Sequence, residues 1–404
     1  MKLYPKYKDS GIEWIGEVPE HWSALRLKWV CNFLYGESLS AQEREDGTIP
    51  VYGSNGIVGY HNRSITEKPC IIVGRKGSFG KVTFSEKKCY PIDTTYYIDC
   101  TSTKNYMRWL WYLLPLLKMD EFSRDSAVPG LNREDAYRNI VTLPSSYEQQ
   151  QIAAYLDRKT TQIDNLISKK QKLIELFKEK RSAIINQAVT KGLNPDAPMK
   201  DSGIEWIGKV PEHWEVKRLK YFFRLITEKN CSLQTKKVAL ENIESWTGRF
   251  IDSEVDYQGE GISFLKGDVL FGKLRPYLAK VLNAKFSGAS VGDIFVMRPK
   301  LGISSRFAFY RFLSKPFIDI VNGSTFGAKM PRVSWDFIAN LHIAMPNNKE
   351  QRTISGYLDS KTTKIDQTIS RIEKQTDLLQ EFRTALISEA VTGKIDVRDG
   401  GSNG

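Results

Sequence analysis

Two glycine-containing loops carry the residues best suited to chemistry in this chain. In "IIVGRKGSFGKVTF" (71–84) and "VLFGKLRPYLAKVLN" (269–283), an apolar run enters a glycine, and a basic residue, an aromatic residue and a Lys-Val pair follow. Glycine lets the backbone turn sharply near a ligand, Lys and Arg bind phosphates or guanine edges, and an aromatic ring stacks or packs on a sugar. Both loops are therefore suited to a DNA groove. Their candidate DNA-contacting residues are Arg75, Lys76, Ser78, Phe79, Lys81, Lys273, Arg275, Tyr277 and Lys280.

Further candidates lie outside these loops. The segment "YGSNGIVGYH" (52–61) offers hydrogen-bonding groups on a glycine-rich turn, although Asn-Gly is also the commonest hairpin signal. Basic residues near "PGLNRED" and in "FGAKMPR" could widen the same surface, or could be solvated charges. The additional DNA-contacting candidates are Ser54, Asn55, Tyr60, His61, Arg133, Lys329 and Arg332.

Other interpretations of the loops stay open at this point. Their basic residues could simply protect an edge strand from aggregation. A nucleotide-binding loop is disfavoured because "GRKGSFGK" has five residues between its outer glycines and lacks the closing Ser or Thr. Phosphate chemistry without nucleic acid is disfavoured because the loop occurs twice.

The composition supports a polyanionic partner. Lys and Arg number 59 against 47 Asp and Glu, which gives a net charge of +12. Five cysteines form no C-x-x-C pair, so we expect neither disulfides nor zinc, and a reducing cytoplasm. The longest apolar run, "WLWYLLPLL", is too short to span a bilayer, so we expect a soluble protein with no membrane contact.

Groups that would alter DNA are missing from the sequence. It has no two adjacent prolines, so the Asn/Asp-Pro-Pro-aromatic loop of base amino-methylation is absent, and it has no G-x-G-x-x-G after a strand and no H-E-x-x-H. An acidic cluster followed by Lys for metal-dependent cleavage is not evident either. We therefore expect no catalytic residue and no metal site.

The segments that flank the loops occur twice in the sequence. "KDSGIEWIGEVPEHW" (8–22) returns as "KDSGIEWIGKVPEHW" (200–214) with one change. A longer segment, 148–190, returns at 350–392. Such self-similarity predicts two versions of one structural unit.

The longer repeat predicts a long helix in each half. Ser146 with Gln149, and Asn348 with Gln351, fit capping boxes after a proline, while Gly192 and Gly393 supply stops. Apolar residues alternate at steps of four and three, which favours pairing between the two helices over each helix covering its own domain. The seam positions are Ile163, Ile167, Lys170, Ile174, Phe177, Arg181, Ile184 and Ala188, and Ile365, Ile369, Ile372, Thr376, Leu379, Arg383, Leu386 and Ala390.

Arg181 and Arg383 occupy equivalent seam positions, where a charge is costly unless it is paired. A partner such as Glu175 or Glu381, or a contact with another protein, could satisfy them.

The predicted fold is α+β, with two strand-rich mixed domains separated by a pair of long antiparallel, coiled-coil-like helices and an internal pseudo-twofold repeat. The expected organisation is a first domain at 1–145, a central helix at 146–192, a second domain at 193–347 and a C-terminal helix at 348–396.

The duplicated motifs resemble the specificity subunits of type I restriction-modification systems. The resemblance covers nearly the whole chain and rests on W-x-G-x-[IV]-P-x-x-W (14–22, 206–214), on P-x-x-x-E-Q-x-x-I-x-x-Y-L-D (144–157, 346–359) and on the following K-T-x-x-I-D. It implies two target-recognition domains that read an asymmetric, bipartite sequence in double-stranded DNA, one half each.

The same resemblance implies partners that supply the chemistry. Two modification subunits would methylate adenine with S-adenosylmethionine, and restriction subunits would cleave with ATP and Mg²⁺, while this chain binds no cofactor and is not an enzyme. Two other classes remain as alternatives, namely a self-contained DNA-modifying enzyme, which the missing motifs disfavour, and a coiled-coil adaptor, which leaves the duplicated basic loops unexplained.

Overall fold

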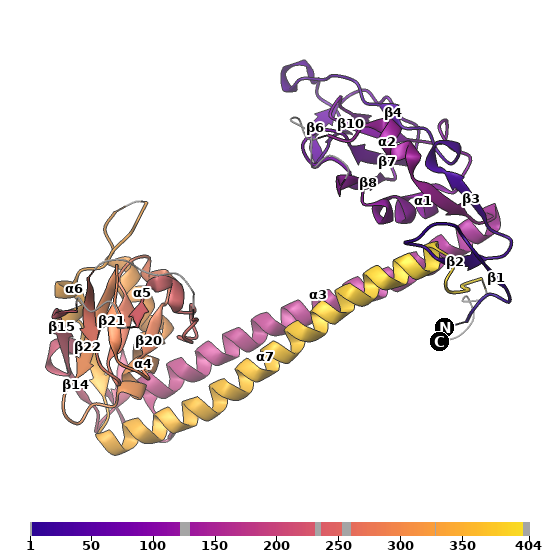
Figure 1. Ribbon diagram of the computed structural model, residues 1–404. Helices are drawn as coiled ribbons and strands as arrows, with labels where there is room; N and C mark the ends of the chain where they lie inside the picture. Colours follow the sequence, from indigo (N-terminus) through magenta and orange to yellow (C-terminus); the bar gives the residue numbers. More distant parts are fainter. Residues whose placement is uncertain (1, 122–129, 231–235, 253–259, 328, 399–404) are drawn as a thin grey trace. The chain divides into compact units, whose positions relative to one another are not determined.

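The computed structural model describes residues 2–121, 130–230, 236–252, 260–327 and 329–398 (Figure 1). The chain forms two compact units. The first unit is Met1–Lys170 with Lys374–Gly404, and the second unit is Gln171–Glu373. The division runs through both long helices, so each unit combines a strand-rich domain with a stretch of each helix. Cys231 lies outside the described residues.

The first unit is built on two small sheets. A four-stranded antiparallel sheet has the order β4-β10-β7-β8, and a three-stranded sheet has the order β6-β5-β9. Two antiparallel pairs of strands, β1-β2 and β3-β11, complete it. The strands are β1 Tyr7–Asp9, β2 Glu17–Pro19, β3 Ser23–Arg26, β4 Leu34–Tyr35, β5 Ile49–Gly53, β6 Gly56–His61, β7 Cys70–Gly74, β8 Val82–Ser85, β9 Tyr90–Pro91, β10 Thr95–Ile98 and β11 Ile140–Leu143, and the short helices are α1 Met107–Leu113 and α2 Arg133–Arg138.

The second unit repeats this plan. Its sheet β15-β22-β19-β20 has the order of β4-β10-β7-β8, and the pairs β12-β13 and β14-β23 match β1-β2 and β3-β11. A separate four-stranded sheet has the order β16-β18-β21-β17. The strands are β12 Met199–Asp201, β13 Lys209–Pro211, β14 Glu215–Arg218, β15 Phe223–Ile226, β16 Lys229–Asn230, β17 Lys237–Val238, β18 Gly261–Phe264, β19 Val269–Gly272, β20 Val281–Asn283, β21 Gly288–Ser290, β22 Ile294–Pro299 and β23 His342–Met345, and the short helices are α4 Ser305–Leu313, α5 Lys315–Gly323 and α6 Trp335–Asn340.

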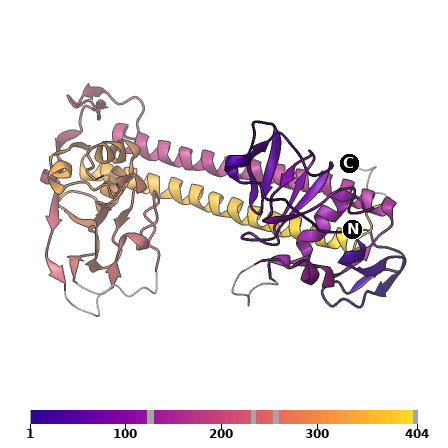
Figure 2. The same ribbon diagram turned by 90° about the horizontal axis from the view of Figure 1, so that it is seen from above.

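The two long helices are α3 (Ser146–Lys191) and α7 (Asn348–Val391). Within each unit a stretch of α3 lies alongside a stretch of α7 in the opposite direction (Figures 1 and 2). The seam predicted from the sequence is the packed face: the apolar seam residues buried there include Ile163, Ile174, Ala188, Ile365, Ile372, Leu386 and Ala390. Among the described residues, no helix is long and apolar enough to cross a membrane.

Two arginines interrupt this seam, and each is paired with an aspartate of the other helix. Arg181 Nε donates to Asp366 at 2.9 Å, and its Nη1 donates to the Trp246 carbonyl at 2.8 Å. Arg383 Nε donates to Asp164 at 2.9 Å. Both aspartates end the repeated K-T-x-x-I-D motif. The duplication therefore produces one reciprocal ion pair in each unit.

The expectation of Glu175 or Glu381 as the arginine partner is wrong. Glu175 lies six residues before Arg181, and Glu381 lies two residues before Arg383. These spacings turn the carboxylates away from the arginine on the same helix, whereas neighbours three or four residues apart share a face. Glu175 pairs instead with Lys178 at 2.9 Å.

The helices α3 and α7 begin at the predicted residues Ser146 and Asn348, but their capping residues differ from the prediction by one position. The side chain that caps α3 is Ser145, whose Oγ accepts the Glu148 N–H at 3.3 Å, and Asn347 Oδ1 accepts the Glu350 N–H at 3.0 Å. Gln149 and Gln351, which were expected to close the capping boxes, make hydrogen bonds to other groups instead. Gln149 Oε1 accepts the Tyr106 N–H at 2.7 Å, and so ties α3 to the segment that enters α1.

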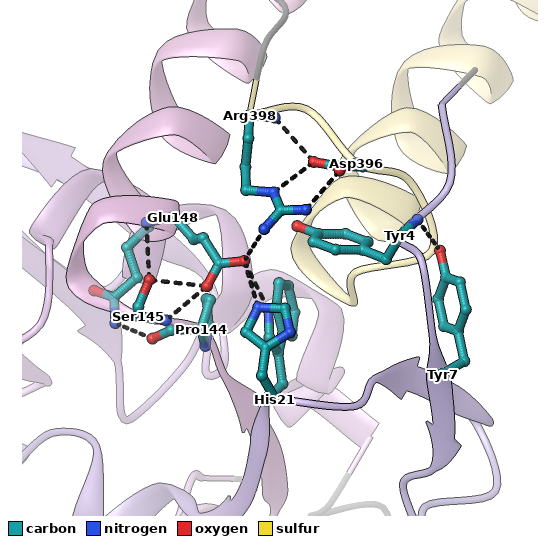
Figure 3. Close-up of polar contacts among 10 residues, drawn as sticks. Tyr4, Tyr7, His21, Pro144, Ser145, Glu148, Asp396 and Arg398 are labelled. Carbon is teal, nitrogen blue, oxygen red and sulfur yellow. Dashed lines mark hydrogen bonds and ion pairs between the residues drawn. The ribbon is translucent and has the colours of Figure 1, made fainter.

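A buried carboxylate joins the opening repeat to the start of α3 (Figure 3). Glu148 Oε1 lies 2.8 Å from His21 Nε2 and accepts the Trp22 indole N–H at 3.2 Å, while Oε2 accepts the Ser145 Oγ–H at 2.8 Å. Trp22 is fully buried. We call Glu148, His21, Trp22 and Ser145 the Glu148 cluster.

The second unit repeats the arrangement around Glu350. His213 Nε2 lies 2.7 Å from Glu350 Oε2, and the Trp214 indole donates to Oε1 at 3.1 Å. The duplicated "P-E-H-W" and "E-Q" sequences are therefore two sides of one contact. Their identity has a structural cause in each unit.

The termini of the described chain meet in the first unit. The Asp396 N–H donates to the Lys2 carbonyl at 2.9 Å, and Arg398 pairs with Asp396 at 2.7 Å. The Arg398 guanidinium also lies 4.6 Å from the ring centroid of Tyr4, beside the Glu148 cluster (Figure 3). Residues 394–398 thus pack beside the first residues of the chain.

The seam arginines allow a matched stability test. We expect Arg181→Ala to destabilise the chain by about 2–3 kcal/mol, because it removes a largely buried ion pair and a bond to a carbonyl. Arg383→Ala is the control, and should cost under about 1 kcal/mol because its pair is more exposed. Side-chain exposure is 10% for Arg181 and 32% for Arg383. Denaturant unfolding of the full chain measures both, and equal losses would contradict this ranking.

The Glu148 cluster predicts a pH-dependent contribution to stability. Burial acts to raise the Glu148 pKa, but hydrogen bonds from His21, Ser145 and Trp22 outweigh it and hold the pKa below its usual value. A lowered carboxyl pKa stabilises the fold above the unfolded pKa of about 4.3, and this contribution is lost as pH falls through the folded pKa. Glu148→Gln should therefore cost about 2 kcal/mol at pH 7 and much less below pH of about 4. Unfolding of both proteins across pH 3–8 checks this, and a cost independent of pH would contradict it.

Candidate nucleic-acid interface

The first loop (75–81) leaves β7 and returns into β8. Gly77 and Gly80 have positive φ angles of 73° and 76°, and a Cβ on Gly80 would lie 2.4 Å from the Asp120 nitrogen. Glycine is thus required for the turn and for the close approach. The loop lies next to the β5-β6 hairpin, because Lys81 Nζ donates to the Asn55 carbonyl at 2.9 Å and to its side chain at 2.8 Å.

Two arginines of the first unit lie against one exposed tyrosine. The guanidinium carbons of Arg75 and Arg133 lie 5.0 Å and 5.1 Å from the ring centroid of Tyr35, a cation–π distance. Arg133 reaches this place because the Leu131 N–H donates to the Arg75 carbonyl at 2.8 Å. Arg75 Nη1 donates to the Asp93 carbonyl at 3.1 Å. Within the described residues no carboxylate neutralises Arg75, so it can bind a phosphate or a guanine edge.

The second loop (273–280) follows β19 in the same way. The Val333 N–H donates to the Lys273 carbonyl at 3.1 Å, so the segment carrying Arg332 lies beside the loop. Here one carboxylate lies between two of the basic residues, whereas in the first loop a carboxylate, Asp93, lies 3.7 Å from Lys76 and none of the described residues pairs a carboxylate with Arg75. Asp293 accepts from Arg332 Nη2 at 2.9 Å and lies 3.6 Å from Lys273 Nζ. The hydrogen bonds from Arg332 are the main cause that lowers the Asp293 pKa.

The structure thus places the predicted candidates in two groups, one per unit. In the first unit the exposed or half-exposed candidates near the loop are Ser54, Asn55, Tyr60, Arg75, Lys76, Ser78, Phe79, Lys81 and Arg133. In the second unit they are Lys273, Arg275, Tyr277, Lys329 and Arg332. Contact of these residues with DNA remains a prediction.

Two candidates are held by contacts within the domain, and this makes them less available to DNA than the prediction assumed. His61 is 7% exposed, its Nδ1 accepts the Glu45 N–H at 3.0 Å, and its ring packs on Tyr90. Its position at the end of β6 directs the side chain inward. Lys280 is half-buried, and its ammonium donates to the Leu240 carbonyl at 2.6 Å.

Some contributors could not be found by inspecting the loops. Tyr35 lies forty residues before Arg75, and Asp293 lies twenty residues after Lys273. Both are brought in by strand pairing, since β10 pairs with both β4 and β7, and β22 pairs with β19. No local signal marks either residue. In the described part of the chain, no cluster of His, Cys, Asp and Glu is suited to a metal ion.

A family model described as the type I restriction modification DNA specificity domain matches residues 19–176 and again 211–375. The chain belongs to this family. The two matches cover most of the sequence and coincide with the structural repeat, so the resemblance drawn from the motifs is confirmed. The function of the chain is therefore DNA sequence specificity in a type I restriction-modification system.

Individual relatives agree over nearly the full length. The type I restriction enzyme EcoDI specificity subunit of Escherichia coli is 22% identical, covering 93% of this chain and 90% of that protein. The MjaVIII specificity subunit of Methanocaldococcus jannaschii is 24% identical, covering 95% of each. The HsdS subunit from Thermoanaerobacter tengcongensis matches in structure with a TM-score of 0.53 at 13% identity, covering 93% of this chain and 98% of that one.

A further solved structure, described as the structural basis underlying complex assembly and conformational transition of the type I R-M system, has a TM-score of 0.68 at 13% identity. It covers 93% of this chain and 98% of its own. At such identity these structures show the fold, which is the α+β architecture with long helices predicted from the sequence.

The difference in charge balance between the loops predicts unequal effects of mutation. Arg75→Ala should weaken DNA binding by about 1–3 kcal/mol, because an unpaired guanidinium is lost. Lys273→Ala should have a smaller effect, because Asp293 already neutralises the ammonium. Titration of a DNA duplex carrying the methylated site, over a range of salt concentrations, measures both. Equal losses of binding free energy for the two variants would show that Asp293 does not reduce the contribution of Lys273.

Proposed function

We propose that the chain reads an asymmetric, two-part sequence in double-stranded DNA, one part with each unit. The observation that carries this proposal is that one scaffold presents two loops of different charge arrangement. Arg75 and Arg133 flank Tyr35 in the first unit, whereas Asp293 holds Lys273 and Arg332 in the second. Different side chains on equivalent turns recognise different bases.

The repeated surface supports two copies of one modification partner. Packing explains the identity of buried residues such as Trp22 and Trp214, but not that of exposed ones. Glu13 and Glu205 are identical and exposed in both copies of the opening repeat, as are Lys8 and Lys200. Equal exposed surfaces suit equal partners in a pseudo-twofold arrangement.

In this proposal the chain is not an enzyme and binds no cofactor. S-adenosylmethionine would be held by the modification subunits, and ATP and Mg²⁺ by restriction subunits. The complex would act in the cytoplasm, in keeping with the free cysteines Cys31, Cys70, Cys89 and Cys100 of the described residues.

Domain replacement tests the proposal. Residues 215–347 are exchanged for the equivalent segment of a relative with a different specificity, and methylated adenines are mapped in DNA treated with the complex. One half of the methylated sequence should change, and the other half should stay the same, because each unit keeps its own core and loop. A change in both halves, or no DNA binding that depends on salt, would refute independent reading.

A further inference from the structure

The two loops follow nearly the same backbone course, with one residue inserted in the second. Gly77 and Gly80 of the first loop have φ angles of 73° and 76°. Their counterparts in the second loop are Arg275 and Ala279, with φ angles of 50° and 46°. Both turns therefore use the left-handed region at equivalent places. Only the first loop fills them with glycine.

A side chain at this backbone conformation is unfavourable. Residues with a Cβ are strained in the left-handed region, which glycine adopts freely. The first loop shows that glycine suits the turn at this position. Backbone geometry therefore gives no reason for the arginine, and non-glycine residues held in this region concentrate at functional sites.

The Arg275 side chain is exposed and available. Lys273 is paired with Asp293, and Lys280 is bonded to the Leu240 carbonyl. Arg275, in contrast, makes no ion pair or side-chain hydrogen bond with any residue that the structure describes. It is the basic residue of the second loop whose guanidinium is free to bind a ligand.

The backbone that carries this side chain is fixed on both sides. The Arg275 N–H donates to the Pro331 carbonyl at 2.7 Å, and its carbonyl accepts the Leu278 N–H at 2.9 Å. Pro276 follows directly and begins a short 3-10 turn, Pro276–Leu278. An arginine fork on a rigid turn is suited to a base edge, because the two N–H groups must meet O6 and N7 of one guanine together.

We propose that Arg275 is the base-reading residue of the second unit, with a guanine in the major groove as its target. This inference rests on the proposed function. It gives the second unit a reading group at a position where the first unit has only Gly77. The first unit instead presents Arg75 and Arg133 at Tyr35, so the two half-sites are read from different places on one scaffold.

Arg275→Gly tests this proposal, because it should increase the stability of the chain while it weakens base recognition. The variant should raise the thermal midpoint by about 2 °C, since glycine removes the backbone strain of a residue with a Cβ in the left-handed region. A randomised duplex pool is selected with the full chain assembled with its modification subunit, and the selected sequences are compared with those of the wild type. The variant should lose a guanine preference at one or two adjacent positions in one half-site and keep the other half-site.

Two further variants complete the experiment. Ala279→Gly changes the same kind of backbone position, but the side chain is 1% exposed, so both half-sites should be retained. Arg275→Lys keeps the charge without the planar fork, and should bind DNA but discriminate guanine at least tenfold less well.

The possible outcomes separate the two proposals. If the wild type selects no bipartite sequence, the proposed function fails. If it does, but Arg275→Gly selects the same sequence, the assignment of Arg275 fails alone. A lower thermal midpoint for Arg275→Gly would also overturn it, because the side chain would then be stabilising the turn.

Discussion

The carboxylates of Glu148 and Glu350 hold together the framework on which each unit depends. Each lies at the start of a long helix, where the helix dipole favours a negative charge. Each accepts hydrogen bonds from a His and a Trp that lie well over a hundred residues earlier in the chain. Without these partners the burial of Glu148 would be costly, so carboxylate, indole and helix start are needed together. The chain leaves this contact after Trp22 and returns to it at Ser145, so the contact closes the domain that lies between them.

Two further residues of the repeated motif, Asp157 and Asp359, connect each long helix to its domain. Asp157 accepts the Tyr112 hydroxyl at 2.7 Å and Arg108 at 2.8 Å, and Asp359 accepts Tyr310 at 2.6 Å. These contacts fix the helix that covers the main sheet of each unit. Each loop follows β7 or β19 directly, so the sheet fixes the place of the loop in its unit. Specificity can change by substitution in a loop, because the backbone beneath it is already determined.

Much of this architecture can be predicted from the sequence, and the incorrect predictions have physical causes. The duplicated motifs and the seam period predict the repeat and both long helices, because helix periodicity is a local property. The seam partners of Arg181 and Arg383 were missed, because they come from a second helix whose register no local pattern gives. Capping was misplaced by one residue because adjacent serines, and adjacent asparagines, offer equal caps. Tyr35 and Asp293 reach the loops only through strand pairing.

The packing of the last residues constrains the order in which the chain can mature. Leu386, Val391, Ile395 and Val397 belong to the core of the first unit, although they are made after the whole second unit. The first domain therefore remains incomplete until residues 386–397 have been synthesised, whereas the second unit has all of its residues by Glu373. Domains commonly fold in the order of synthesis. Here the first domain cannot complete its core before the second unit has been synthesised, so a chain that stops at Glu373 would leave exposed the part of the first core that Leu386, Val391, Ile395 and Val397 cover.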